Sequence, residues 1–187
     1  MRHLIFEMAG RKAILTGSGP GRQLLSALVS AQPSTSAPTP VFLDFEGVEV
    51  ATASFLRESV IGFRNYCRQS IPNAYPVLAN LSADVSEEIE FFIKARGDAL
   101  WVCDLNARGA VSHGRIIGEL EPAQREAFNA AIQLGSVTAA TLAKSFSKQA
   151  IGNTAWNNRL SALAAKGLLM ETRQGKTKSF NPPLENK

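Results

Sequence analysis

Residues 138–182, in the last third of the sequence, constrain the fold more than any other stretch. Leu142 and Phe146 lie four positions apart, so they fall on one face of a short helix predicted over residues 138–146. A polar segment that ends in glycine follows, and residues 153–166 have the pattern of a second helix. The spacing therefore predicts two helices joined by a tight turn.

The residues after the second helix have the pattern of a β-ribbon. Gly167 stands at the helix C-terminus, where a residue that can adopt positive φ is favoured. Residues 168–172 and 177–181 are predicted strands, with a tight basic turn over residues 173–176 between them. Helix, turn, helix and ribbon together predict a unit of the type that places one helix in a DNA groove.

The second predicted helix has two different faces. At about 100° per residue, its large apolar side chains fall on one side: Trp156, Leu160 and Leu163. The opposite side carries small and amide side chains, with one residue on each flank: Thr154, Asn158 and Ser161, then Asn157 and Arg159. An Asn side chain can donate and accept hydrogen bonds together, as an adenine edge requires, so this face suits contact with bases. A solvated helix face without a ligand is the alternative.

The net charge of +4 comes entirely from the C-terminal part of the chain. Residues 1–118 hold 11 Lys and Arg and 11 Asp and Glu, whereas residues 119–187 hold 9 against 5. A basic module joined to a neutral one predicts that the basic part binds a polyanion, with phosphate contacts dominating the affinity. A random scatter of charge is the alternative. The residues predicted to contact DNA are Lys148, Asn153, Thr154, Asn157, Asn158, Arg159, Ser161, Arg173, Lys176 and Lys178.

The sequence NTAWNNRLSALAAKGLL, followed by GKTKSFNP, resembles the winged helix-turn-helix proteins of bacterial regulators. Their recognition helix commonly ends in Leu-x-x-x-Gly-Leu-hydrophobic, a pattern matched here by Leu163, Gly167, Leu168 and Leu169. The resemblance implies a winged helix-turn-helix domain over residues 118–187 that binds double-stranded DNA. The centre of the outer helix face carries no Lys or Arg, a departure that disfavours guanine readout.

The first part of the chain alternates predicted strands with predicted helices. The strands are residues 3–8 and 12–16, with a turn between them, and residues 41–45, 75–80, 99–103 and 110–117. Helices are predicted after the glycine cluster at residues 17–22, over residues 53–69 and after Ser82 or Asp84. This alternation predicts an α/β domain with a mixed sheet over residues 1–117. A further helix over residues 121–134 begins the second domain.

The sequence PVFLDFEGVEVATASFLRESVIGF, with YPVLANLSADVSEEIEFF after it, is similar to the STAS-like domain family, which is related to the anti-anti-sigma fold. The matching residues are Leu43, Asp44, Phe45, Gly47, Val48 and Ser54. In anti-anti-sigma proteins a serine in this loop is phosphorylated by a partner kinase, which makes Ser54 a candidate switch residue. Phe55 replaces the glycine of that loop. An ordinary helix N-cap, at Thr52 or Ser54, is the alternative role.

Other candidate sites have less support. The glycine cluster at residues 17–22 lacks the Lys-Ser/Thr of a phosphate-binding loop, so a turn into a helix is the favoured interpretation. Asp44 ends a predicted buried strand and is either a site carboxylate or a loop anchor. His3 and His113 have no Cys or His at ligand spacing. No nucleophile motif is present, so we expect no enzyme activity, metal or cofactor.

The sequence features also bound the setting in which the protein works. Cys67 and Cys103 are expected to be reduced, buried thiols of a cytoplasmic protein. No apolar run approaches the ~20 residues of a membrane span, and the start does not resemble a signal peptide. The chain is predicted to be a DNA-binding regulator whose first domain binds a protein partner, a second copy or a signal. The alternative is a partner-switching interaction module without direct DNA binding. A homodimer is expected for a module that binds two-fold DNA sites.

Overall fold

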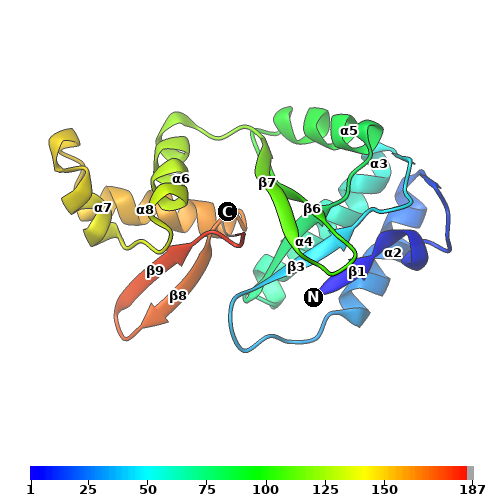
Figure 1. Cartoon of the computed structure of the whole chain (residues 1–187), viewed down its shortest axis with the longest axis horizontal. Helices are drawn as coiled ribbons and strands as arrows, with labels where there is room; N and C mark the ends of the chain where they lie inside the picture. The colour runs from blue at the N-terminus through cyan, green and yellow to red at the C-terminus, as the bar shows by residue number, and fades with distance from the viewer. Residues whose placement is uncertain (185–187) are drawn as a thin grey trace. The chain divides into compact units, whose positions relative to one another are not determined.

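The structure is a computed structural model that describes residues 1–184. The last three residues of the predicted second domain, 185–187, lie outside this range. By its internal contacts the chain divides into two compact units, residues 1–119 and residues 120–187, called here the N-terminal and C-terminal units (Figure 1). The protein has an α/β fold with a mixed sheet, as the alternation of strands and helices predicted.

A five-stranded sheet forms the centre of the N-terminal unit. In spatial order its strands are β1 (Arg2–Leu4), β3 (Thr39–Asp44), β5 (Ala74–Ala79), β6 (Ala99–Leu105) and β7 (Val111–Gly118). Neighbouring strands from β1 to β6 are parallel, and β7 is antiparallel to β6. Every residue of β5 is buried, which explains why the sequence of this central strand is almost wholly apolar.

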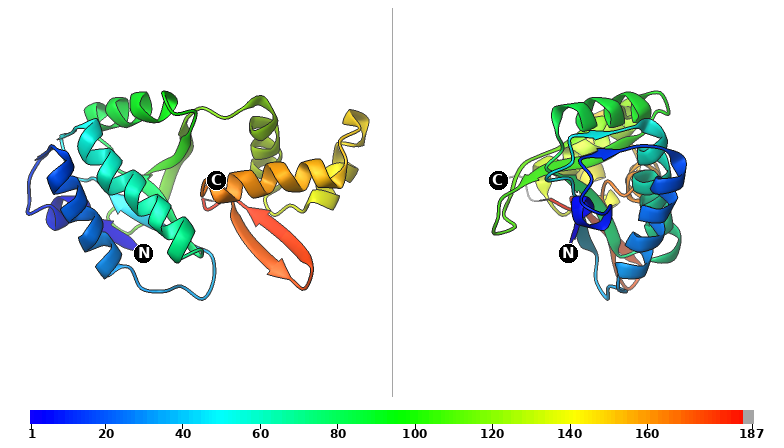
Figure 2. Two further views of the ribbon diagram at one scale, coloured as in Figure 1. Left: turned by 180° about the vertical axis from the view of Figure 1, so that it is seen from behind. Right: turned by 90° about the vertical axis from the view of Figure 1, so that its right-hand side faces the viewer.

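Helices cover this sheet. They are α2 (Ser18–Ala31), a continuous helical stretch formed by α3 (Ala53–Leu56), η1 (Arg57–Ile61) and α4 (Gly62–Ser70), and α5 (Ala83–Lys94). The stretch over residues 53–70 matches the predicted helix, but η1 is a π-helical turn that the sequence periodicity did not predict. α2 lies beside this stretch (Figure 2).

The glycine cluster leads into α2, as predicted. Gly17 has a φ of +85° and precedes the first helical residue. Gly21 serves a packing purpose, because a Cβ at this position would lie 2.7 Å from the carbonyl oxygen of Phe55 in α3. Close contact between two helices therefore accounts for this glycine, without a phosphate ligand.

The prediction for the first 16 residues is wrong in part. The predicted strand over residues 3–8 is extended only as far as Leu4, in β1, and Ile5–Met8 form the short helix α1. β2 (Ile14–Leu15) does not pair with β1 but runs parallel to β4 (Val50–Ala51) in a separate two-stranded sheet. A short apolar run does not distinguish strand from helix, and here the chain turns as soon as it leaves the edge of the sheet.

The C-terminal unit contains three helices and a ribbon in the predicted order. They are α6 (Pro122–Leu134), α7 (Ala139–Ser145), α8 (Asn153–Ala165), β8 (Met170–Gln174) and β9 (Thr177–Asn181), with the 3-10 turn η2 (Ser147–Gln149) before α8. β8 and β9 are antiparallel. Val137, between α6 and α7, forms a β-bridge with Phe180 of β9, so the ribbon is attached to the helical part by backbone hydrogen bonds.

Candidate nucleic-acid interface

α8 holds most of the predicted DNA-contacting residues, and its apolar side fixes how they are presented. Trp156, Leu160 and Leu163 are fully buried, as predicted. The Trp156 ring lies 5.7 Å from the ring of Phe146, the residue that ends α7. The residues of α8 that remain exposed are Asn153, Thr154, Ala155, Asn158 and Ala165. α8 therefore presents short, uncharged side chains to solvent.

Asn157 and Ser161 are not part of this exposed face. Asn157 is half-buried on the flank of the helix. Ser161 is half-buried as well, and its Oγ is buried and makes no hydrogen bond within residues 1–184. Ala164, one turn later, is buried, so the packed side of α8 is wider than the large apolar residues indicate.

Arg159 is held within the C-terminal unit. Its Nη1 donates to Glu126 Oε2 of α6 at 2.6 Å, and its guanidinium lies 5.1 Å from the centre of the Trp156 ring. Only 23% of the Arg159 side chain is exposed. The predicted flank position is correct, but this cation is directed toward α6. The sequence did not predict Glu126 as the partner of Arg159, because residue spacing gives no signal for an ion pair between residues 33 positions apart.

The ribbon carries three of the predicted cations, and one carboxylate neutralises part of their charge. The prediction that Arg173 lies in the turn is wrong, because Arg173 belongs to β8 and pairs across the ribbon with Lys178 of β9. Glu171 accepts from Arg173 Nε at 2.9 Å and from Lys178 Nζ at 3.1 Å. The sequence did not predict that Glu171 pairs with these two cations either. Lys176 is exposed at the tip, after Gly175 with a φ of +59°, and has no ion pair within residues 1–184.

Two further lysines lie near the start of α8. Lys144 is exposed in the last turn of α7, and Lys148 is exposed in η2. Ala150, between η2 and α8, has a left-handed φ of +54°, which closes the turn between the two helices. The exposed cations of the unit therefore lie on the segments that precede and follow α8, and not on its exposed face.

The predicted switch residue lies at the start of α3, where a carboxylate is already bound. Ser54 is half-buried, and its Oγ lies 3.2 Å from Oγ1 of Thr52, the N-cap residue. The Oε1 of Glu88, on α5, accepts from the backbone N–H of Ala53 at 2.7 Å. A phosphate on Ser54 would compete with this carboxylate for the positive end of the helix.

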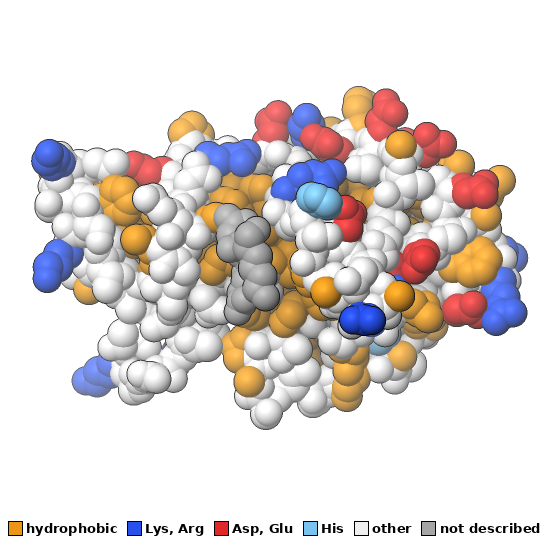
Figure 3. Space-filling model, viewed as in Figure 1, with side chains coloured by type: hydrophobic (Ala, Val, Ile, Leu, Met, Phe, Trp, Pro, Cys, Tyr) orange, Lys and Arg blue, Asp and Glu red, His pale blue; other side chains and the backbone are white. Residues whose placement is uncertain are grey.

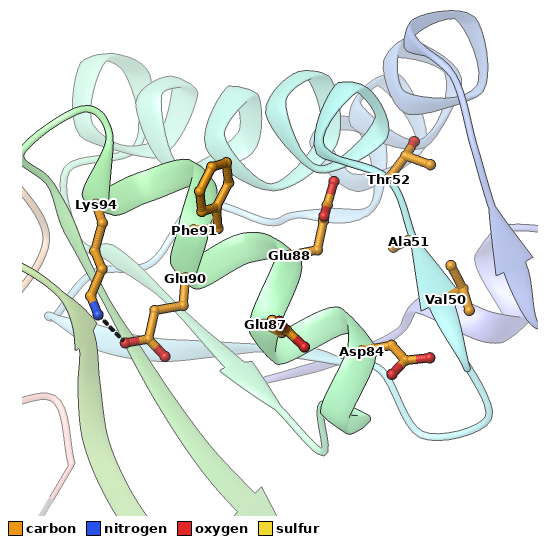
Figure 4. Close-up of a pocket in the computed structure, with 9 residues that line it drawn as sticks. All are labelled: Val50, Ala51, Thr52, Asp84, Glu87, Glu88, Glu90, Phe91 and Lys94. Carbon is orange, nitrogen blue, oxygen red and sulfur yellow. Dashed lines mark ion pairs between the residues drawn. The ribbon is translucent and has the colours of Figure 1, made fainter.

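Glu88 also belongs to an open hollow in the N-terminal unit (Figure 4). The residues that line it are Val50, Ala51, Thr52, Asp84, Glu87, Glu88, Glu90, Phe91 and Lys94. Lys94 pairs with Glu90 at 3.1 Å, and the Phe91 side chain is 75% exposed. On the face that Figure 3 shows, Asp and Glu side chains lie among Lys and Arg side chains over the N-terminal unit.

Asp44 has the role of a loop anchor. It is 1% exposed at the end of β3. Its carboxylate pairs with Arg2 and accepts from the Asn80 side chain at 2.9 Å and from the backbone N–H of Glu46 at 3.0 Å. These bonds join the carboxyl end of β3 to the first residue of β1 and to Asn80 after β5, and account for the buried charge without a ligand.

The remaining observations are negative. Residues 1–184 contain no group of three or more His, Cys, Asp or Glu side chains arranged to hold a metal ion. Within the same range, the helices are too short or too polar to cross a bilayer. Comparison of the chain with models of protein families, with curated proteins and with solved structures found no match.

Proposed function

We propose that this chain is a DNA-binding regulatory protein whose C-terminal unit is a winged helix-turn-helix domain. α8 is the recognition helix, which enters the major groove, and the β8–β9 ribbon is the wing, which contacts the phosphate backbone. The N-terminal unit is a STAS-like domain that receives a signal or a protein partner. A homodimer would bind a two-fold DNA site.

The observation that carries this proposal is the distribution of side chains around α8. Its exposed face has only small and amide side chains, which allow close approach to base edges. Exposed cations lie on the turn before it, at Lys148, and on the ribbon after it, at Lys176. An uncharged helix face between flanking cations is the arrangement that base contacts by the helix and phosphate contacts on either side of it require.

A gel-shift assay of the full chain on a random-sequence duplex at low salt tests the proposal. We expect a shifted band that weakens as salt is raised, because phosphate contacts release counterions. The same protein is run with heparin as a polyanion competitor, which should abolish the shift. If no shift appears at any protein concentration in low salt, the proposed function is wrong.

A partner-switching function without DNA binding is the second candidate, favoured by the hollow beside the start of α3. Its carboxylates and the exposed Phe91 suit a basic protein surface with an apolar anchor, and Ser54 lies in the adjoining helix start. This candidate expects no gel shift. It also expects Ser54→Glu, which adds a negative charge beside Glu88, to change partner binding in a pull-down assay. Ser36→Glu, at an exposed position in the loop before β3, should not change it.

A further inference from the structure

We propose that α8 selects A·T base pairs in the major groove, and that Asn158 is the residue that reads adenine. This inference rests on the proposed DNA-binding function and names the class of sequence that it recognises. It follows from which donors and acceptors α8 has available at its exposed face.

The major-groove edges of adenine and guanine require different partners. Adenine presents an acceptor at N7 and a donor at N6, so an Asn side chain can bond both with Nδ2 and Oδ1. Guanine presents two acceptors, N7 and O6, which a guanidinium or ammonium group satisfies and a single amide does not. The supply of cations on α8 therefore decides which of the two purines it can read.

No cation of α8 is available for guanine. Arg159 is the only basic residue within Asn153–Ala165, and its guanidinium is occupied by Glu126 at 2.6 Å and held against Trp156. Lys166 follows the last helical residue and is half-buried. Neither residue belongs to the exposed face, so a bidentate contact with guanine would require Arg159 to leave its ion pair.

Asn158 is placed for the adenine contact. It is exposed and lies about 200° around the helix from Trp156, so it points away from the packed side. Thr154 lies one turn before it on the same face and is also exposed, so it would meet a neighbouring base pair. The Thr154 methyl group and the Ala155 side chain offer apolar contacts for the thymine methyl group. The other exposed amide, Asn153, begins the helix, where phosphate contact is favoured.

Selection from a duplex library with 20 random base pairs tests the inference, with the full-length protein and two variants. Asn158→Ala removes the proposed contact and favours helix formation. Asn129→Ala is the matched control, because Asn129 is an exposed asparagine on α6. Circular dichroism checks that both variants are folded. We expect wild type and Asn129→Ala to enrich A·T pairs at the same positions. Asn158→Ala should lose at least about fivefold of the preference at one of them.

Base analogues in the selected duplex identify the groove. Inosine·cytosine pairs keep the minor-groove pattern of A·T but present guanine's acceptors in the major groove, and 7-deazaadenine removes only the N7 acceptor. Both should weaken binding by wild type. 7-Deazaadenine should not matter to Asn158→Ala, and inosine·cytosine should weaken binding by Asn158→Ala less than binding by wild type, because only the thymine-methyl contact is then lost. The inference is overturned if the enriched positions are G·C, or if duplex is bound without any preference. Unchanged preference in Asn158→Ala, or tolerance of both analogues by wild type, also overturns it. Absence of binding to the whole library would remove the proposed function as well.

Discussion

Arg159 of α8 and Glu126 of α6, 33 positions apart in the sequence, form a 2.6 Å ion pair that joins the two helices. The pair fixes α8 against α6 and directs the only cation within the helix toward the protein itself. In the proposed DNA complex, electrostatic attraction by the C-terminal unit would therefore come from the lysines outside α8 and from Arg125 and Arg173.

Glu126→Gln should release Arg159 for phosphate contact. We expect tighter binding to random duplex and a salt dependence steeper by about one unit, because one further counterion is released. Both side chains of the pair are partly exposed, so the free energy of unfolding should fall by at most ~1 kcal/mol. Fluorescence anisotropy over a range of salt concentrations measures the binding. Glu121→Gln, exposed at the start of the same helix, changes the net charge equally. Equal effects of the two variants would contradict the release of Arg159.

Lys176→Ala should weaken binding to every sequence alike. Lys176 is exposed at the ribbon tip, so its loss should reduce the salt slope by about one unit without changing stability or sequence preference. Adding Lys178→Ala should have a smaller further effect, because Lys178 is paired with Glu171. The control is Lys94→Ala, which removes the same charge from the N-terminal unit. If the binding of Lys176→Ala depends on salt concentration as steeply as that of wild type, the ribbon tip does not contact DNA.

Glu171→Gln should have the opposite effect on binding. The Glu171 carboxylate holds both Arg173 and Lys178, so its neutralisation releases two cations of the ribbon. We expect tighter non-specific binding and a steeper salt dependence than in wild type. Glu87→Gln, an exposed acid of the N-terminal unit, provides the comparison for net charge. If binding to random duplex does not strengthen beyond that of Glu87→Gln, Arg173 and Lys178 do not contact DNA.

Local periodicity was enough to predict most of the helices and strands. The spacing of Trp156, Leu160 and Leu163 predicted both the existence of α8 and its buried side, and the apolar run before Asp44 predicted the strand β3. These signals are local, since a helix or strand that must bury one side carries the pattern within its own sequence. The failure at Ile5–Met8 has the same origin, because four apolar-rich residues are too few to define a period.

The electrostatic details of the site could not be predicted, because they depend on contacts between distant segments. Glu126 and Glu171 change what Arg159, Arg173 and Lys178 can do, and nothing in the spacing of these residues shows that they meet. The burial of Ser161 likewise depends on what packs beside α8. A helical wheel gives the direction of a side chain but not its neighbours.

The two cysteines should be unreactive in the folded protein. Burial raises the pKa of the Cys67 thiol to about 11, partly offset by Arg68. Burial raises the pKa of Cys103 to about 12, with the carboxylates of Asp104 and Asp44 adding to the effect. Because the thiolate is the reactive form, Ellman's reagent at pH 8 should label neither residue rapidly in the native state and both in denaturant. Rapid release of one equivalent without denaturant would contradict the burial.

The same raised pKa values predict that stability falls at alkaline pH. The fold favours the neutral thiols, so their contribution is fully present below the ordinary thiol pKa of 9.0 and is lost as pH rises toward the folded values near 11 and 12. Between pH 8 and pH 10, this should lower the free energy of unfolding by roughly 1 kcal/mol for each thiol. Urea titrations at the two pH values measure the change. In a variant with both Cys67→Ala and Cys103→Ala, the free energy of unfolding should fall less between pH 8 and pH 10 than in wild type, by the contribution of the two thiols. The comparison does not depend on the variant's stability at pH 8, because the other groups titrate equally in both proteins. Equal decreases in variant and wild type would show that neither thiol resists ionisation in the fold.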